Sequence, residues 1–326
     1  MIIKDIANYL DELAPLKYAE DFDNVGLLVG DYKTIVTGVL VTLDTLESVV
    51  DEAIEKNCNL IVSFHPIIFS GLKRINGNNY VEKVILKAIK NDIAIYAIHT
   101  ALDNSIKGVS AKMAEVLNLT NTEILLPKKG LIKKLTTYAP TIDAEKVRNA
   151  LFKEGAGTIG NYNNCSFNMD GLGTYKGNEH SNPTLGKKGK FHIENETFIS
   201  VIFEKHLQNN ILKALFEAHP YEEVAYDIVT TDNNHQDIGM GMVGELTYPM
   251  NEKEFLFFLK EKFNLQTIRH SKFLKKSIKK IALLGGSGSF AIDAAIISGA
   301  DIYISADFKY HDFFKAEKEI VLVDIG

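Results

Sequence analysis

A chain of 326 residues, 46% of them hydrophobic and 24% charged, can bury a sizeable core and is expected to fold as about two domains. A formal net charge of −6 gives no general attraction for phosphate backbones, so nucleic acid is not indicated as a partner. Because no stretch has the length of a membrane span, no secretory leader begins the chain and the two cysteines lie far apart, we expect a cytoplasmic protein without membrane contact or disulfides.

The first 127 residues alternate between strand-like and helix-like segments. An amphipathic helix opens the chain, a turn-forming segment rich in Asp, Asn and Gly occupies 22–31, and a strand-like run ends at Asp44 before a helix. The apolar runs 60–64 and 93–98 have the length and β-branched content of buried parallel strands, and the helical segment 81–90 joins them. Another helix follows at 108–119. This order predicts an α/β domain with a parallel-type sheet covered on both faces.

The order of the predicted strands and helices changes between residues 128 and 245. Strand, helix, strands, helix and strand follow one another there, which is the order of a ferredoxin-like α+β module. From 246 to 326 the alternation of helices and buried strands returns. We therefore predict a discontinuous α/β domain, with parts at 1–127 and 246–326, interrupted by an inserted domain at 128–245.

Polar side chains and a glycine turn recur at the carboxyl ends of the predicted core strands, where ligands bind in open α/β sheets. They are Asp44, His65, His99, Asp103, Gly285 to Ser289, Asp307, His311 and Asp324. Imidazole and carboxylate donors together suit Zn, Mn, Fe or Co, and such an ion activates water as a nucleophile. This pattern predicts a divalent-metal site.

Two further motifs allow other interpretations. The run GSGSFA at 286–291, with Asp307 about 20 residues on, fits the dinucleotide fingerprint. Steric need for glycine, or a helix N-terminus that accepts an anion, explains it as well. The run HPYEEVAYDI at 219–228 places His219, Glu222 and Glu223 at a strand start, where a polar turn that feeds an edge strand is the simpler interpretation.

Several segments together resemble the GTP cyclohydrolase 1 type 2 homologues, a family also described as dinuclear-metal-centre hexameric proteins. The matching pieces span almost the whole chain in order: FDNVGLLVG, SFHPIIFSGLKRI, IYAIHTALDN, HPYEEVAYDI, GMGMVGEL, KKIALLGGSGS, ADIYISADFKYHDFFKAE and VDIG. The resemblance implies an α/β domain interrupted by a PII- or CutA-like insert. It also implies a homohexamer, a trimer of dimers, with one or two divalent ions per subunit.

The resemblance assigns metal ligands at two positions of this chain. His65 matches the family's His before Pro, and Asp103 matches the Asp of its His-Thr-x-Leu-Asp segment. Many members carry a second His where this chain has Phe64, which cannot coordinate a metal ion. The remaining family ligands follow the Asp-x-Gly segment, at which this chain stops with Gly326. Either the chain is shortened at its C-terminus, which we favour, or its metal site is incomplete.

Three other residues, His99, Asp307 and His311, are expected in the same cavity, where they would contact a substrate or orient a metal ligand. The leading functional hypothesis is a metal-dependent hydrolase that acts on a nucleotide or a related small substrate. The alternative is a hexameric metal-binding scaffold or regulatory protein without turnover.

Overall fold

The computed structural model describes residues 1–326 and divides into two compact units. Unit 1 comprises Met1–Pro127 and Asp237–Gly326, and unit 2 comprises Lys128–Gln236. The second boundary therefore lies at 236 rather than at the predicted 245. The reason is that Gly239–Asn251 forms a strand of unit 1, paired along its length with two other strands of that unit.

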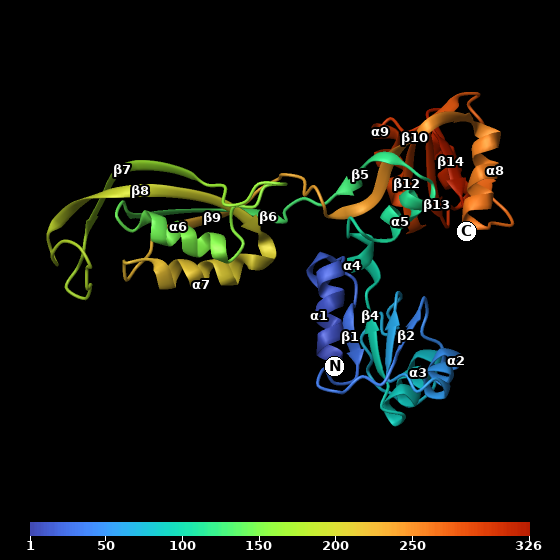
Figure 1. The fold of residues 1–326 in the computed structure, drawn as a ribbon, viewed down its shortest axis with the longest axis horizontal. Coiled ribbons are helices and arrows are strands. Elements are labelled where there is room, and N and C mark those ends of the chain that lie inside the picture. The colour runs from blue at the N-terminus through green and yellow to red at the C-terminus, as the bar shows by residue number, and fades with distance from the viewer. The chain divides into compact units, whose positions relative to one another are not determined.

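The first sheet of unit 1 has four strands in the order β1-β4-β3-β2 (Figure 1). β2, β3 and β4 are parallel, and β1 joins β4 as an antiparallel edge. Helix α1 packs on one face, through Ile3 and Ala7, and α2 and α3 pack on the other. The elements are α1 (Ile3–Leu13), a 3-10 turn (Leu16–Tyr18), β1 (Gly26–Val29), β2 (Val39–Thr42), α2 (Glu47–Glu55), β3 (Leu60–Ser63), α3 (Tyr80–Lys90) and β4 (Ala94–Ala97).

The second sheet of unit 1 has six strands in the order β11-β14-β13-β12-β10-β5. β12, β13 and β14 are parallel, whereas β5, β10 and β11 pair antiparallel with their neighbours. The connection from the first sheet runs through α4 (His99–Asp103) and α5 (Val109–Val116). The strands are β5 (Thr120–Pro127), β10 (Gly239–Asn251), β11 (Arg269–His270), β12 (Ser277–Ser287), β13 (Ile302–Ala306) and β14 (Val321–Asp324). The prediction of one parallel-type sheet was therefore wrong, because unit 1 contains two mixed sheets.

Helices cover both faces of this second sheet as well. Alternate residues of β13 point to opposite faces, so Ile302 and Ile304 pack with α5 and α8, while Tyr303 packs with α9 and the turn before β14. The elements are α8 (Glu252–Phe263), α9 (Ile292–Ile297) and the 3-10 segments Ser289–Ala291 and Tyr310–Ala316. None of the helices of the protein combines the length and hydropathy that a membrane crossing requires.

Unit 2 is a four-stranded antiparallel sheet in the order β7-β8-β6-β9, with α6 and α7 on one face (Figure 1). When the four strands are numbered by their order in the chain, their order across the sheet from β9 is fourth, first, third, second. This is the ferredoxin-like arrangement that the sequence predicted. The elements are β6 (Ile132–Pro140), α6 (Ala144–Lys153), β7 (Phe167–Lys176), β8 (Phe191–Glu204), a 3-10 turn (Lys205–Leu207), α7 (Gln208–Ala218) and β9 (Tyr226–Thr230).

In each unit, the two segments that connect to the other unit lie next to each other. In unit 1, Pro127 at the end of β5 lies opposite Gly239 at the start of β10. A side chain at position 239 would overlap the carbonyl oxygen of Leu126, so this close approach requires glycine. In unit 2, the backbone N–H of Thr231 donates to the carbonyl oxygen of Ile132 at 3.0 Å.

Candidate functional site

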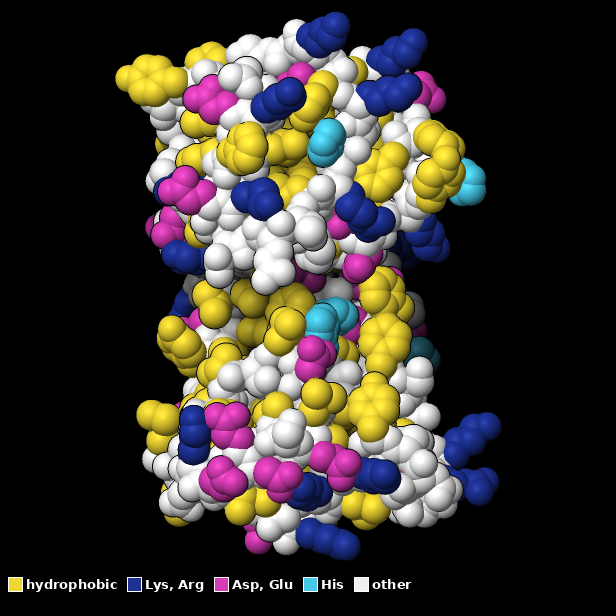
Figure 2. All heavy atoms as spheres, turned by 90° about the vertical axis from the view of Figure 1, so that its right-hand side faces the viewer, with side chains coloured by type: hydrophobic (Ala, Val, Ile, Leu, Met, Phe, Trp, Pro, Cys, Tyr) yellow, Lys and Arg dark blue, Asp and Glu magenta, His cyan; other side chains and the backbone are white.

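A cleft of about 880 Å³ opens in unit 1 and is lined by residues of both its sheets. Figure 2 looks onto unit 1 and shows a hollow at its waist, with histidine and acidic side chains beside hydrophobic ones. Three predicted site residues of the first sheet, His65, His99 and Asp103, lie in the cleft wall. The second sheet contributes Leu284 to Ser287, Ala306 and Asp307.

His65 directly follows Phe64 at the carboxyl end of β3. Its imidazole Nδ1 donates a hydrogen bond to Asp44 Oδ1 at 2.8 Å. Asp44 follows β2, the parallel neighbour of β3, and the pairing of Thr42 with Ser63 brings the two strand ends together. The His65 side chain is 45% exposed. With Nδ1 engaged as donor, Nε2 is left as the ring's acceptor for a ligand.

His99 begins α4 just beyond β4 and is held in the same manner. Its Nδ1 donates to Asp23 Oδ1 at 2.9 Å, and the Asp23 side chain is fully buried. Asp23 also accepts hydrogen bonds from the backbone N–H of Thr100 at 3.1 Å and from the Thr100 hydroxyl. Burial opposes ionisation of Asp23, but the bonds from His99 and Thr100 outweigh it and lower the pKa of this carboxyl.

The backbone at His99 is unusual, since its φ is +24°. A non-glycine residue in this region is strained, and such positions cluster at functional sites. Asp307, on the opposite side of the same cleft, also has a positive φ, of +57°. Both cleft walls therefore carry a non-glycine residue held in a sparsely populated conformation by the surrounding fold.

Asp103, at the last position of α4, is a carboxyl group without a hydrogen-bond partner. Its side chain lies in the cleft with His99 and His65, and removal from water raises its pKa to about 6. The two imidazoles offset part of this rise, while Asp23 and Glu20 add to it. The imidazoles therefore favour its charged form too weakly to outweigh its removal from water.

The rings of Phe64, His65 and His99 form one contact cluster. The centroids of the two imidazoles are 5.4 Å apart, and Phe64 lies 5.0 Å from His65 and 5.5 Å from His99, edge to face. Two imidazoles on one tetrahedral ion lie roughly 5 Å apart between centroids, given zinc–nitrogen bonds of about 2.0 Å. The spacing of the histidines therefore suits a shared ion.

The donor chemistry of the cleft fits a divalent ion, although its side chains do not converge fully in this structure. Two imidazole nitrogens and one carboxylate are the mixed donors that zinc, manganese, iron and cobalt accept. No group of three or more His, Cys, Asp or Glu side chains in the chain is arranged so that it could hold a metal ion as it stands. His65 and Asp103 are thus on one wall and in one cavity, without a closed coordination shell around them.

Of the other two predicted cavity residues, one lines the cleft and the other does not. Asp307 lines the cleft, as expected from its place after β13. His311 does not line it, and this prediction was wrong. The segment after Asp307 turns into a 3-10 helix that leaves His311 exposed, stacked edge to face against Tyr310 and Phe314.

The glycine turn between β12 and α9 is explained by packing. A side chain at Gly288 would overlap the hydroxyl groups of Ser305 and Tyr303, and the Tyr303 hydroxyl donates to the Gly288 carbonyl oxygen at 2.9 Å. The steric interpretation of this motif therefore accounts for its second glycine. The helix that follows has only six residues.

The sequence did not identify Asp23 as a site residue. Asp23 is 76 residues away from His99 in the chain, and it appeared only as part of the turn-forming segment 22–31 and of the family match FDNVGLLVG, without a role of its own. Asp44 was noted at a strand end but without its bond to His65. An aspartate in a glycine-rich turn between a helix and a strand was the only local signal available for Asp23.

Comparison with known proteins agrees with this fold. A sequence model of the Duf34/NIF3 (NGG1p interacting factor 3) family matches residues 1–326. The GTP cyclohydrolase 1 type 2 homolog of Bacillus subtilis (strain 168) is 39% identical over 309 residues, which cover 94% of this chain and 83% of that protein. The crystal structure of a Bacillus cereus protein related to NIF3 superimposes with a TM-score of 0.83 at 38% identity, covering 100% of this chain and 88% of the other. The Staphylococcus aureus protein SA1388 gives a TM-score of 0.80 at 32% identity, with 100% and 87% covered.

Proposed function

This chain belongs to the Duf34/NIF3 family, and we propose that the cleft of unit 1 is a divalent-metal site that serves a hydrolase. His65 and Asp103 hold the ion in this proposal, and His99 is the third side chain within reach of the same cavity. A divalent cation held there supplies Lewis-acid activation of water for hydrolysis. Zinc, manganese, iron and cobalt suit the donors.

One observation supports the proposal above all others. Two neighbouring imidazoles are each fixed through Nδ1 by a carboxylate, Asp44 for His65 and Asp23 for His99, so each keeps Nε2 available. Carboxylate–histidine pairs of this kind orient metal-binding imidazoles and increase their basicity. A histidine that served packing alone would have no need of an aspartate that fixes its tautomer at the mouth of a cleft.

The lining of the cleft favours a compact substrate with a flat, apolar body. Phe22, Phe64 and Phe290 supply aromatic surface, and no Lys or Arg is among the residues that line it. Phosphate groups of a nucleotide would therefore depend on the metal ion for their neutralisation. The name of the relatives, GTP cyclohydrolase 1 type 2 homolog, points to a nucleotide, and we propose a nucleotide or related heterocycle as the substrate class.

A substrate panel tests the enzyme. Bases, nucleosides and nucleotides are incubated with the purified protein loaded with zinc or manganese, and hydrolysis products are quantified by chromatography. The variants are His65→Ala and Asp103→Asn, and the matched control is His180→Ala, which removes an exposed histidine of unit 2. Turnover is expected in the parent and the control and a loss of at least about 100-fold in both site variants, since even the outer partners of a ligand contribute 10- to 100-fold.

The same panel distinguishes the hydrolase from the alternative, a metal-binding scaffold. A metal-binding scaffold would take up metal through His65 and Asp103 and turn over no substrate of the panel. Metal uptake without turnover would therefore contradict the hydrolase proposal and support the scaffold. Equal turnover by the parent and the two site variants would show that the reaction does not take place in the cleft.

We further propose that the protein assembles as a homohexamer, and that unit 2 is a PII- or CutA-like module of each subunit. The family resemblance supports the assembly, and the ferredoxin-like strand order supports the module. Light scattering is expected to give six times the 36.3 kDa of the chain. A monomer at micromolar concentration would contradict the assembly.

A further inference from the structure

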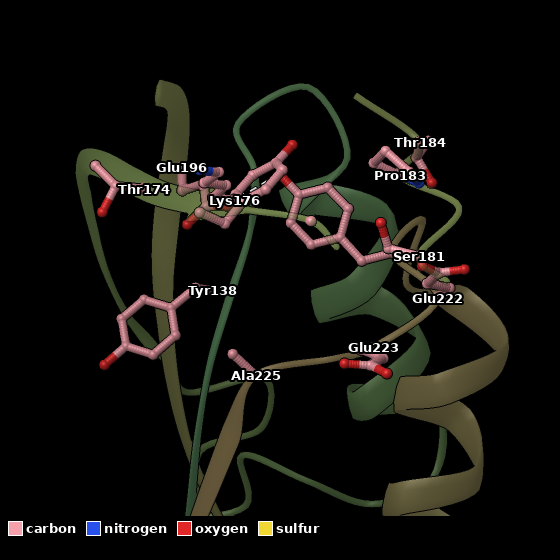
Figure 3. Close-up of a pocket in the computed structure, with 13 residues that line it drawn as sticks. Tyr138, Thr174, Lys176, Ser181, Pro183, Thr184, Glu196, Glu222, Glu223 and Ala225 are labelled. Carbon is pink, nitrogen blue, oxygen red and sulfur yellow. Dashed lines mark hydrogen bonds between the residues drawn. The ribbon is translucent and has the colours of Figure 1, made fainter. Parts of the chain in front are cut away.

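We propose that unit 2 binds a small organic cation, an ammonium group on a compact apolar body, in a pocket between its sheet and the turn that follows α7. The pocket has a volume of about 300 Å³. Figure 3 shows its side chains: Thr174 and Lys176 come from β7, Tyr138 from β6, Glu196 from β8, and Glu222 and Glu223 from the turn before β9. The site lies wholly within unit 2 and is separate from the cleft of unit 1.

Three tyrosines provide the apolar walls. Tyr138, Tyr175 and Tyr221 line the pocket, and the rings of Tyr175 and Tyr221 pack edge to face with centroids 5.7 Å apart. An aromatic face attracts a cation within about 6 Å of the ring centroid, most strongly when the cation is a weakly hydrated organic ammonium. Aromatic walls alone would accept any apolar ligand, so the charge of the ligand has to come from other groups.

Three carboxylates supply that charge. Glu196, Glu222 and Glu223 line the pocket, none of them forms an ion pair, and Lys176 is the one basic side chain in the lining. Glu223 has no hydrogen-bond partner, and Glu222 accepts one bond, from the backbone N–H of Asn182. The pocket is therefore left with a net negative charge that the protein does not balance, which disfavours an anion.

Glu196 is held in position by contacts with Tyr221 and Gly173. One carboxylate oxygen accepts a hydrogen bond from the Tyr221 hydroxyl at 2.9 Å. The carboxylate lies over Gly173 of the neighbouring strand, where any side chain would overlap it. Glycine at position 173 thus creates the space that Glu196 occupies, and no hydrogen bond of the protein engages the other carboxylate oxygen.

His219 fixes two of the walls. Its Nε2 donates to the carbonyl oxygen of Tyr138 at 2.9 Å, and its Nδ1 accepts from the backbone N–H of Tyr221 at 3.1 Å. The buried histidine therefore ties the turn to the sheet and acts as a positioning residue. The motif HPYEE, which a polar turn explained at the level of sequence, supplies Tyr221, Glu222 and Glu223 to the pocket.

Calorimetric titration of the full chain with choline tests the proposal. The control ligand is 3,3-dimethylbutan-1-ol, which has the same shape without the charge. Choline is expected to bind at least tenfold more tightly than the alcohol, a difference of about 1.4 kcal/mol. Equal affinities of the two ligands, or no heat from either, would overturn the proposal.

Two variants, each with a matched control, locate the binding. Glu223→Gln changes an exposed side chain without partners, so the fold is kept, and choline affinity is expected to fall at least fivefold. Gly173→Ala is expected to displace Glu196 and lower the affinity as well, whereas Gly171→Ala on the same strand has open space around it and should leave the affinity unchanged. Glu217→Gln, on α7 and outside the pocket, controls for the loss of a charge. Choline binding that survives both Glu223→Gln and Gly173→Ala would place any site elsewhere.

Discussion

At the scale of single residues, Asp103 is a carboxyl group that unit 1 withdraws from water without a hydrogen-bond partner. Its pKa is about 6 in the folded protein against 3.8 in the open chain. Below pH 3.8 it is protonated in both states and has no effect. Between pH 4 and 6 the unfolded chain ionises first, so the metal-free protein loses stability as the pH rises, by about 3 kcal/mol in all.

Asp103→Asn should abolish this loss. We expect the variant to be more stable than the parent at pH 7.5 when both are metal-free, and equally stable at pH 3.5. Urea unfolding of chelator-treated protein at the two pH values measures the difference. A variant that is less stable than the parent at pH 7.5 would show that Asp103 has a stabilising partner after all.

His219 predicts the opposite pH dependence in unit 2. Burial lowers its pKa below the ordinary 6.5, with the bond to the Tyr138 carbonyl as a partial offset. The stabilising contribution of a neutral buried histidine is complete above pH 6.5 and is lost as the pH falls through the lowered value. The protection factors of amide hydrogens in β6 and α7, which are corrected for the intrinsic exchange rate at each pH, should therefore fall between pH 7.5 and 5.5. His219→Gln should remove this fall, and a fall that persists in the variant would assign the transition to another group.

Residues of the cleft were predictable where a strand end fixes their position. His65, His99 and Asp103 follow β3 and β4, and apolar runs reveal the ends of such strands. His311 follows β13 by the same reasoning but points elsewhere, because a short 3-10 turn sets its direction and no sequence period reveals that turn. Asp23 was unpredictable since its partner His99 is distant in the chain.

At the scale of elements, the edge strand β1 depends on Gly30. Its φ is +109°, and a Cβ there would lie 2.6 Å from Ala94 Cβ and 3.0 Å from Ala94 Cα in the neighbouring strand. Gly30→Ala is expected to destabilise unit 1 by about 2 kcal/mol, because strain and overlap act together and the backbone cannot give way cheaply. Chemical denaturation measures the effect. Gly71→Ala, with open space and no positive φ, should change little, and equal effects of the two substitutions would refute the packing argument.

The pairing of elements was less predictable than their existence. The alternation of strands and helices indicated an α/β unit and a ferredoxin-like insert, and the structure contains both kinds of unit. The split into two sheets was missed because β5 was not recognised as a strand. Its pairing with β10, as in Ile124 with Met242, joins segments more than a hundred residues apart, and strand propensity carries no information on such partners.

At the scale of the whole molecule, unit 2 should be separable from unit 1. Pro127 and Gly239 are paired in unit 1, so a short Gly/Ser linker can replace residues 128–236 without stretching either strand. We expect the shortened chain to unfold cooperatively, to keep metal uptake at the His65 site and to lose choline binding. Circular dichroism and the two titrations check this. A shortened chain that fails to fold would show that unit 1 needs the insert for its stability.

The central claim is that His65 and Asp103 share a divalent ion. Crystals of the protein grown with zinc, with data collected at the zinc edge, test it most directly. The account predicts an anomalous peak at about 2.0–2.2 Å from His65 Nε2 and from a carboxylate oxygen of Asp103. A cleft without a peak at millimolar zinc, or zinc bound by other residues while His65 and Asp103 remain apart, would contradict it.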